Sequence, residues 1–255
     1  MLSTAPKDRR LLVTLTNEPF QPVRLYYSIP DRASAIKSLR RLECTVNAPE
    51  EQCWHWLFEA EAAPLRFTGS YDDVPMERRP IILGRLRFPM AGSMTLQTNS
   101  IQRAIGAARF FAPHLGPESV LMRCRLVNRL FAAEEDQPDE LMKTLDREVT
   151  VIDPREAEAA FTREFRDVRT KEDFERVASE SLKRKLESKE DVPLVEDFRL
   201  APEEETSDFG NLTMTLQLRL IRAMEHWRGN TELTLAALIV RTVKSGFPGG
   251  QIPEP

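Results

Sequence analysis

Arginines at alternate positions of three predicted β-strands are the side chains in this sequence best suited to binding chemistry. They are Arg24, with the neighbouring Tyr26, in residues 23–29, Arg85 and Arg87 in residues 81–88, and Arg123, Arg125 and Arg129 in residues 120–131. Successive side chains of a strand point to opposite faces, so each set lies on one side of its strand. Guanidinium groups bind phosphate through paired hydrogen bonds. If the strands are neighbours, the pattern predicts an anion-binding or nucleic-acid-binding face.

Two interpretations of that face stay open. Trp54, Trp56 and Phe58 also alternate, and as exposed rings they would stack on nucleic-acid bases. In the second interpretation these three side chains lie in the core, and acidic helices from later in the chain cover the arginines. The whole chain has a net charge of −4, whereas nucleic-acid-binding domains are usually basic. Nucleic acid is therefore the less favoured partner.

Cys53 and His55 lie on the same side of a predicted strand and could begin a metal site. Such a site needs two further ligands, and no second His or Cys pair stands at metal-binding spacing nearby. We therefore expect no metal ion and no cofactor, and interpret Cys53 as a packed thiol. Together with Cys44 and Cys124 it makes an odd number of widely spaced cysteines, which predicts no disulfide framework.

Motifs of the common enzyme classes are missing. The sequence contains no Gly-rich phosphate loop and no dinucleotide fingerprint, and it has only 10 glycines from which to build one. Asp208-Phe-Gly210 matches one kinase triplet, but the other kinase motifs are absent, so we interpret the match as chance. We expect a protein that is not an enzyme. An enzyme whose catalytic residues come from distant positions remains a third hypothesis.

Charge divides the chain into a basic first part and an acidic second part. Residues 1–135 contain 18 Lys and Arg against 14 Asp and Glu, whereas residues 136–255 contain 18 against 26. This split favours either an external anion for the basic part or contact between the two parts. No stretch approaches the roughly 20 apolar residues of a membrane helix, and the N-terminus lacks a signal-peptide core. We expect a cytoplasmic protein without membrane contact.

The order of predicted elements indicates an α+β fold. Alternation typical of strands covers residues 23–29, 53–59, 81–88, 94–98 and 120–131, and helical periodicity covers 34–42 and 101–115. Residues 53–59 also permit a short helix. Asp31 and the pair Asn99-Ser100 stand where they can cap the two helices. We expect residues 1–152 to form an antiparallel sheet layer, compatible with a ferredoxin-like βαββαβ arrangement.

Residues 153–255 are predicted to be mainly helical and to pack on that sheet. Before this part of the chain, we expect a helix over residues 139–147 and then a strand over residues 149–152 that returns to the sheet. Residues 155–190 are strongly charged and have narrow apolar stripes, so they cannot form a core alone. Residues 191–211, which contain prolines and the acidic run Glu203–Glu205, predict an extended linker. Helices are expected over residues 212–227 and 231–243.

These patterns favour a non-enzymatic binding or assembly protein that acts through protein contacts. Its expected partner is another protein or a second copy of this chain. The alternative is a nucleic-acid-binding module that uses the arginine-rich face. The two hypotheses differ in whether that face is open or covered by residues 155–243.

Overall fold

The computed structural model describes residues 9–135, 137–152, 192–200 and 210–245, together with single positions and short runs between 159 and 184. The chain divides into two compact units, Met1–Pro154 with Pro193–Leu216, and Arg155–Val192 with Gln217–Pro255. The β-sheet belongs to the first unit. Among the described residues, no helix combines the length and the apolar character needed to span a membrane.

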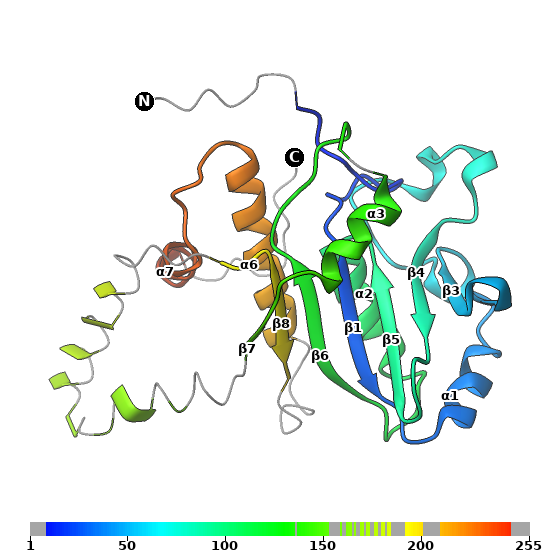
Figure 1. Ribbon diagram of the computed structural model, residues 1–255, viewed down its shortest axis with the longest axis horizontal. Helices are drawn as coiled ribbons and strands as arrows, with labels where there is room; N and C mark the ends of the chain where they lie inside the picture. The colour runs from blue at the N-terminus through cyan, green and yellow to red at the C-terminus, as the bar shows by residue number, and fades with distance from the viewer. Residues whose placement is uncertain are drawn as a thin grey trace. The chain divides into compact units, whose positions relative to one another are not determined.

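Eight strands form one mostly antiparallel sheet, in the order β2-β3-β4-β5-β1-β6-β8-β7 (Figure 1). Their bounds are β1 Val23–Ser28, β2 Thr45–Ala48, β3 Cys53–Leu57, β4 Ile82–Arg87, β5 Ser93–Thr98, β6 Val120–Val127, β7 Val149–Ile152 and β8 Val195–Arg199. Neighbouring strands run antiparallel except β7 and β8, which are parallel. The predicted mixture of helices with an antiparallel sheet is confirmed.

Short helices connect many of the strands, and the two longer C-terminal helices follow the last strand. The described α-helices are α1 Arg32–Leu39, α2 Ile101–Phe111, α3 Pro138–Met142, α6 Gly210–Trp227 and α7 Leu235–Ser245, and the 3₁₀ helices are η1 Pro49–Glu51, η2 Ala60–Ala62, η3 Tyr71–Asp73, η4 Met76–Arg78 and η5 Lys143–Asp146. Asp31 accepts a hydrogen bond from the Ser34 backbone N–H at 2.9 Å, and Ser100 accepts one from Arg103 at 3.1 Å. Such bonds satisfy free N–H groups at helix starts, so both predicted caps are confirmed.

The main core lies between one face of the sheet and α2. Leu25 of β1, Leu96 of β5 and Leu86 of β4 are directly paired across the sheet and have no exposed surface. Helix α2 buries Ala104 and Phe111 against β1 and β5. Burial of this apolar surface is the principal stabilising contribution to the unit.

The alternating aromatic residues Trp54 and Trp56 of β3, and Phe58 just after it, belong to this core. Trp56 has no exposed surface, and its ring centroid lies 5.3 Å from those of both Phe110 and Phe111. Trp54 and Phe58 are 8% and 6% exposed. None of the three rings is available to stack on a base, so the core interpretation is confirmed.

A smaller core lies on the other face of the sheet, beneath α3 and η5. Leu141, Met142 and Leu145 pack there against Val127 of β6 and Val195 of β8. In Figure 1, α3 lies in front of the sheet and α2 lies behind it. The α3–η5 segment thereby brings polar side chains over the face that carries the arginines.

Two segments differ from the sequence-based expectation. Residues 191–211, expected to be an extended linker, contain strand β8 and the first residues of α6. Glu196 and Asp197 of β8 are acidic, yet both are buried. Because acidic residues are typical of solvated segments, the sequence pattern did not indicate a strand here. Strand β6 ends at Val127, before the predicted end at Phe131. The charged helical pattern of residues 155–190 lies mostly outside the described residues.

Candidate functional site

Pairing of the strands arranges polar side chains of one sheet face into two cross-strand rows. The first row runs His55, Arg85, Gln97, Arg24, Arg125 and Asp197, and the second runs Arg87, Thr95, Tyr26, Arg123 and Arg199. Directly opposed residues share a face. Six of the seven residues expected on the arginine face therefore do lie on one face, with β5 between the two arginines of β4 and Arg24 of β1.

Arg24 is held by Asp146 at the end of η5. Its Nη1 donates a 2.7 Å hydrogen bond to Asp146 Oδ1, and its Nη2 donates one of 3.1 Å to Oδ2. Nη2 also donates to Gln97 Oε1 at 3.2 Å. The hydrogen bonds from Arg24 lower the pKa of Asp146 against the opposing effect of burial, and the charges of Arg24 and Arg125 lower it further. Asp146 is therefore ionised at neutral pH and fixes one side of Arg24.

Asp197 holds the two arginines of β6. It has no exposed surface; Arg125 Nε donates to its Oδ2 at 2.8 Å, and Arg123 Nε lies 3.3 Å from its Oδ1. The Arg123 guanidinium also lies 3.9 Å from the ring centroid of Tyr26. A buried carboxylate needs such partners to remain charged. Arg123, Arg125 and Tyr26 thus have internal partners.

Arg129 stands apart from the other predicted residues. It follows the end of β6, where its Nη2 donates a 2.7 Å hydrogen bond to Glu135 Oε2. Its guanidinium lies 4.4 Å from the Phe131 ring centroid. Arg129 was expected on the sheet face because residues 120–131 alternate throughout, but the strand stops before it.

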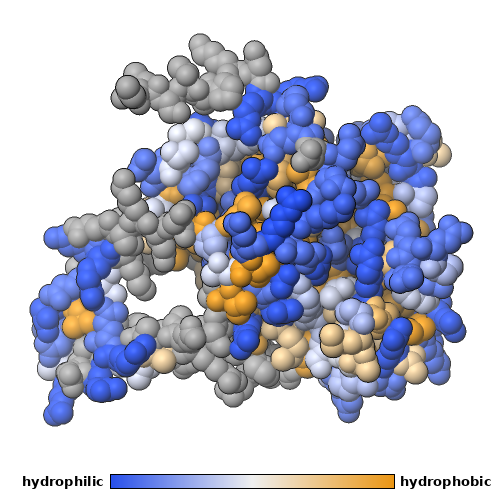
Figure 2. Space-filling view, in the orientation of Figure 1, coloured by the Kyte–Doolittle hydropathy of each residue, from blue (hydrophilic) through white to orange (hydrophobic). Residues whose placement is uncertain are grey.

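A cavity of about 300 Å³ lies between the remaining arginines and the α3–η5 segment; we call it the arginine pocket. Its lining residues are Arg24, Glu51, Arg85, Arg87, Gln97, Asp139, Met142, Lys143 and Asp146. Figure 2 looks onto this side of the sheet and shows hydrophilic surface over α3 and the adjacent strands. Residues from six elements, β1, η1, β4, β5, α3 and η5, therefore converge on one small polar cavity.

Charge in the arginine pocket is nearly balanced, because four basic and three acidic side chains line it. Arg85 Nε lies 3.3 Å from Glu51 Oε2, and Lys143 Nζ lies 2.6 Å from Glu140 Oε1. Of the four basic side chains, only Arg87 forms no ion pair within the part of the chain that the structure describes, and the carboxylate of Asp139 forms none there either. A guanidinium can form two parallel hydrogen bonds to a phosphate or carboxylate. Arg87 is therefore the group most ready to receive an anion.

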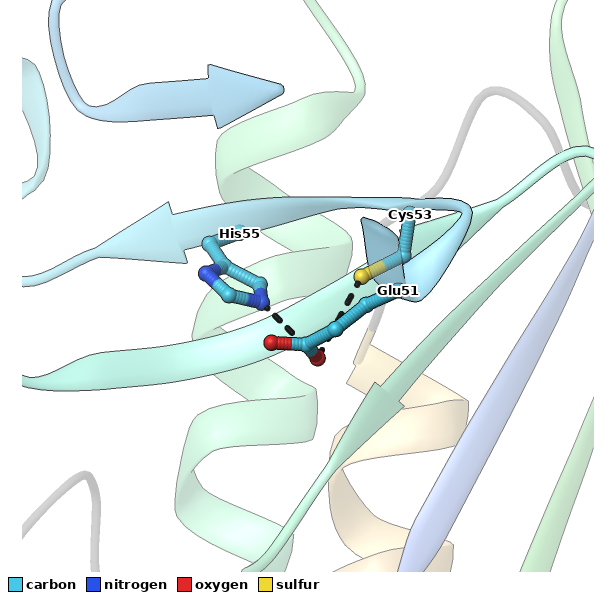
Figure 3. Close-up of side chains that lie close together, drawn as sticks. All are labelled: Glu51, Cys53 and His55. Atoms are coloured by element: carbon cyan, nitrogen blue, oxygen red, sulfur yellow. Dashed lines mark hydrogen bonds and ion pairs between the residues drawn. The ribbon is translucent and has the colours of Figure 1, made fainter. Parts of the chain in front are cut away.

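A second cluster adjoins the pocket at the β2–β3 turn. Glu51, Cys53 and His55 bring their ligand-type atoms within 4.8 Å of one another, and Figure 3 shows the side chains converging. His55 Nε2 lies 3.1 Å from Glu51 Oε2, which in turn lies 3.8 Å from Cys53 Sγ. Burial raises the pKa of the Cys53 thiol, while the charges of Arg87 and Arg85 act in the opposite direction. Oxygen, sulfur and nitrogen donors are thus gathered at one point.

Several residues of the site were not anticipated from the sequence. Gln97 alternates with Met94 and Leu96 on a predicted strand, and that pattern could have placed it on the polar face. Lys143 and Asp146 lie within the predicted helix of residues 139–147, and nothing in the local pattern indicates that they reach the sheet. Glu51 stands two residues before Cys53, as Cys53 stands two residues before His55. This spacing could have marked Glu51 as a third member of the cluster.

Comparison with known proteins gives no family model, no curated protein and no solved structure that matches this chain. Function must therefore be inferred from the site's own chemistry.

Proposed function

We propose that this protein is a non-enzymatic binding protein whose arginine pocket takes a small multivalent anion of the phosphate-ester or diphosphate class. The observation that carries the proposal is the convergence of Arg24, Arg85, Arg87 and Lys143 on one cavity of about 300 Å³. That volume is at the lower end of ligand pockets. Two or more negative charges suit several guanidinium groups held on different strands.

A small anion fits the site better than a nucleic-acid polymer. Arg123 and Arg125 have Asp197 as their partner, and Tyr26 lies against Arg123. A single-strand platform needs free cationic groups along a groove and exposed rings on which bases stack. The buried Trp54, Trp56 and Phe58 do not supply such rings. Of the nucleic-acid hypothesis we therefore keep only the binding of phosphate groups by the arginine pocket, and not the stacking of bases on the sheet.

Other expectations remain proposals. A protein partner or self-association is compatible with an anion pocket, since an acidic peptide side chain is also an anion. The ferredoxin-like arrangement is supported by the antiparallel order β4-β5-β1-β6 within the sheet. Packing of the C-terminal helical part on the sheet and a cytoplasmic location also remain predictions.

Replacing Arg87 by Gln is expected to weaken pyrophosphate binding about 10- to 100-fold, the worth of one charge-assisted hydrogen-bonding group. The measurement is isothermal titration calorimetry at two salt concentrations. Binding to the unaltered protein should weaken as salt rises, because opposite charges in a solvated pocket are screened.

Arg78→Gln is the matched control, since Arg78 is exposed and does not line the cavity. It should bind pyrophosphate as the unaltered protein does. A short single-stranded oligonucleotide serves as a second ligand. Equal affinity of the Arg87 and Arg78 variants for pyrophosphate would contradict the proposal. Tight oligonucleotide binding without pyrophosphate binding would restore the nucleic-acid hypothesis in its place.

Replacing Asp146 by Asn should have the opposite effect and strengthen pyrophosphate binding by up to about fivefold, the worth of a solvated ion pair. The carboxylate competes with the ligand for Arg24, whereas the amide still accepts a hydrogen bond without the charge. Calorimetry also checks this variant, and weaker binding would count against the assignment of Arg24.

The same variant tests the role of Asp146 in stability. Folding lowers the pKa of Asp146. The Arg24–Asp146 ion pair therefore stabilises the fold fully above the pKa of an unfolded Asp side chain, about 3.9. This stabilisation disappears as the pH falls through the lower pKa that Asp146 has in the folded protein. Urea unfolding between pH 3 and 7 should show a smaller loss of stability on acidification for Asp146→Asn.

A further inference from the structure

We infer that Glu51, Cys53 and His55 form a three-ligand site for a zinc-like divalent cation at the β2–β3 turn. Cys53 and His55 stand at alternate positions of β3, so the extended backbone directs them to the same side. Glu51 is the last residue of η1 and reaches this side through the turn that follows it. Gln52 adopts a left-handed conformation, φ 53°, between η1 and β3. This turn brings Glu51 back over the strand, where Figure 3 shows its carboxylate between the other two side chains.

Distances within the cluster suit a tetrahedral metal ion. Bonds of about 2.0–2.3 Å from zinc to O, N and S place neighbouring ligand atoms about 3.3–3.8 Å apart. The Glu51–His55 and Glu51–Cys53 separations are 3.1 and 3.8 Å, and the third separation is within 4.8 Å. Small side-chain rotations therefore suffice to close the site.

The donor set selects the class of cation. A thiolate and an imidazole favour zinc over magnesium or calcium, which prefer oxygen ligands. Three protein ligands leave one tetrahedral position for water or another ligand, as in catalytic rather than structural zinc sites. The sequence-based expectation of no metal assumed that both missing ligands must come from afar, whereas Glu51 lies only two residues from Cys53.

The enclosure of His55 provides a further indication. Its Nε2 atom is fully enclosed and, among the described residues, makes no hydrogen bond of acceptable geometry, although it lies 3.1 Å from a carboxylate oxygen. Buried polar atoms in native proteins nearly always have a partner. A metal ion between the imidazole and the carboxylate satisfies both groups.

Arg85 is the group that opposes this site. Its Nε lies 3.3 Å from the same Glu51 oxygen, so a cation competes with Arg85 for Glu51. Glu51 also lines the arginine pocket, and the two sites adjoin. The metal site does not rest on the anion proposal, because zinc binding is measurable without any phosphate ligand.

The test uses Co²⁺ as a spectroscopic substitute for Zn²⁺ on the full chain, kept reduced with a phosphine. We expect binding of one Co²⁺ with a sulfur-to-cobalt charge-transfer band, which stoichiometric Zn²⁺ abolishes. Cys53→Ser should remove the band. His55→Gln and Glu51→Gln should each weaken Zn²⁺ binding at least about 100-fold in competition with a chromophoric chelator, more than loss of an outer-sphere partner would.

Glu50→Gln is the matched control, because Glu50 is exposed on the same turn and lies outside the cluster. Circular dichroism confirms that each variant is folded before titration. No charge-transfer band in the unaltered protein would overturn the inference. A band that is lost only in Cys53→Ser, with His55→Gln and Glu51→Gln unaffected, would also overturn it, since it indicates a metal adduct of a single thiol.

Discussion

Replacing Arg103 by Met is expected to destabilise the sheet unit by about 3–5 kcal/mol, the cost of removing one partner of a buried ion pair. Arg103 of α2 is 2% exposed, and its Nε donates to Glu18 Oε1 at 3.1 Å. It also donates to Thr16 Oγ1 at 2.9 Å and to the Ile82 carbonyl at 3.1 Å. Without it the fully buried Glu18 carboxylate keeps only hydroxyl partners.

Urea unfolding followed by circular dichroism measures this effect. Arg109→Met on the same helix is the control, since Arg109 is exposed and its replacement should change stability by no more than about 0.5 kcal/mol. The double variant Glu18→Met with Arg103→Met should be more stable than the single Arg103 variant, because no charge is left buried. Equal stability of Arg103→Met and Arg109→Met would refute the buried pair.

Replacing Trp56 by Ala should cost about 3–5 kcal/mol, as for other large aromatic side chains removed from a core. Trp56 is fully buried between the sheet and α2, against Phe110 and Phe111. The substitution removes the buried apolar surface of Trp56 and its contacts with the two phenylalanine rings, and it leaves a cavity in the core. Chemical unfolding again provides the measurement.

Trp56→Phe separates ring packing from indole hydrogen bonding. The indole Nε1 has no hydrogen-bond partner among the described residues, so Phe should retain most of the stability. A stable Trp56→Ala variant that lost oligonucleotide binding would mean that Trp56 is a stacking residue, contrary to its position in the core.

The sequence predicted those parts of the fold that have strong local patterns. The period-two alternation placed β1, β4, β5 and β6, and the caps Asp31 and Ser100 placed α1 and α2. The same alternation put Arg24, Arg85, Arg87, Arg123 and Arg125 on one face, which the strand register bears out. Local patterns of this kind depend only on residues close together in the sequence, so they can be recognised without knowledge of the tertiary structure.

Partners of the arginines could not be predicted in this way, because they come from distant segments. Asp197 lies 72 positions after Arg125 in the chain, on a strand whose buried acids resemble a solvated linker. Asp146 lies 122 positions after Arg24. Without these two carboxylates the arginine face is expected to be an open basic surface. With them, only the region around Arg87 retains unpaired positive charge in the described part of the site.

The most direct test of the anion-binding pocket is NMR of the arginine side-chain Nε–Hε groups during titration with pyrophosphate. We predict saturable shifts for Arg24, Arg85 and Arg87, which line the pocket. Arg129, which pairs with Glu135, and the exposed Arg78 should not shift. Absence of shifts in the three pocket arginines, or equal shifts at Arg78 and Arg129, would contradict the proposed function.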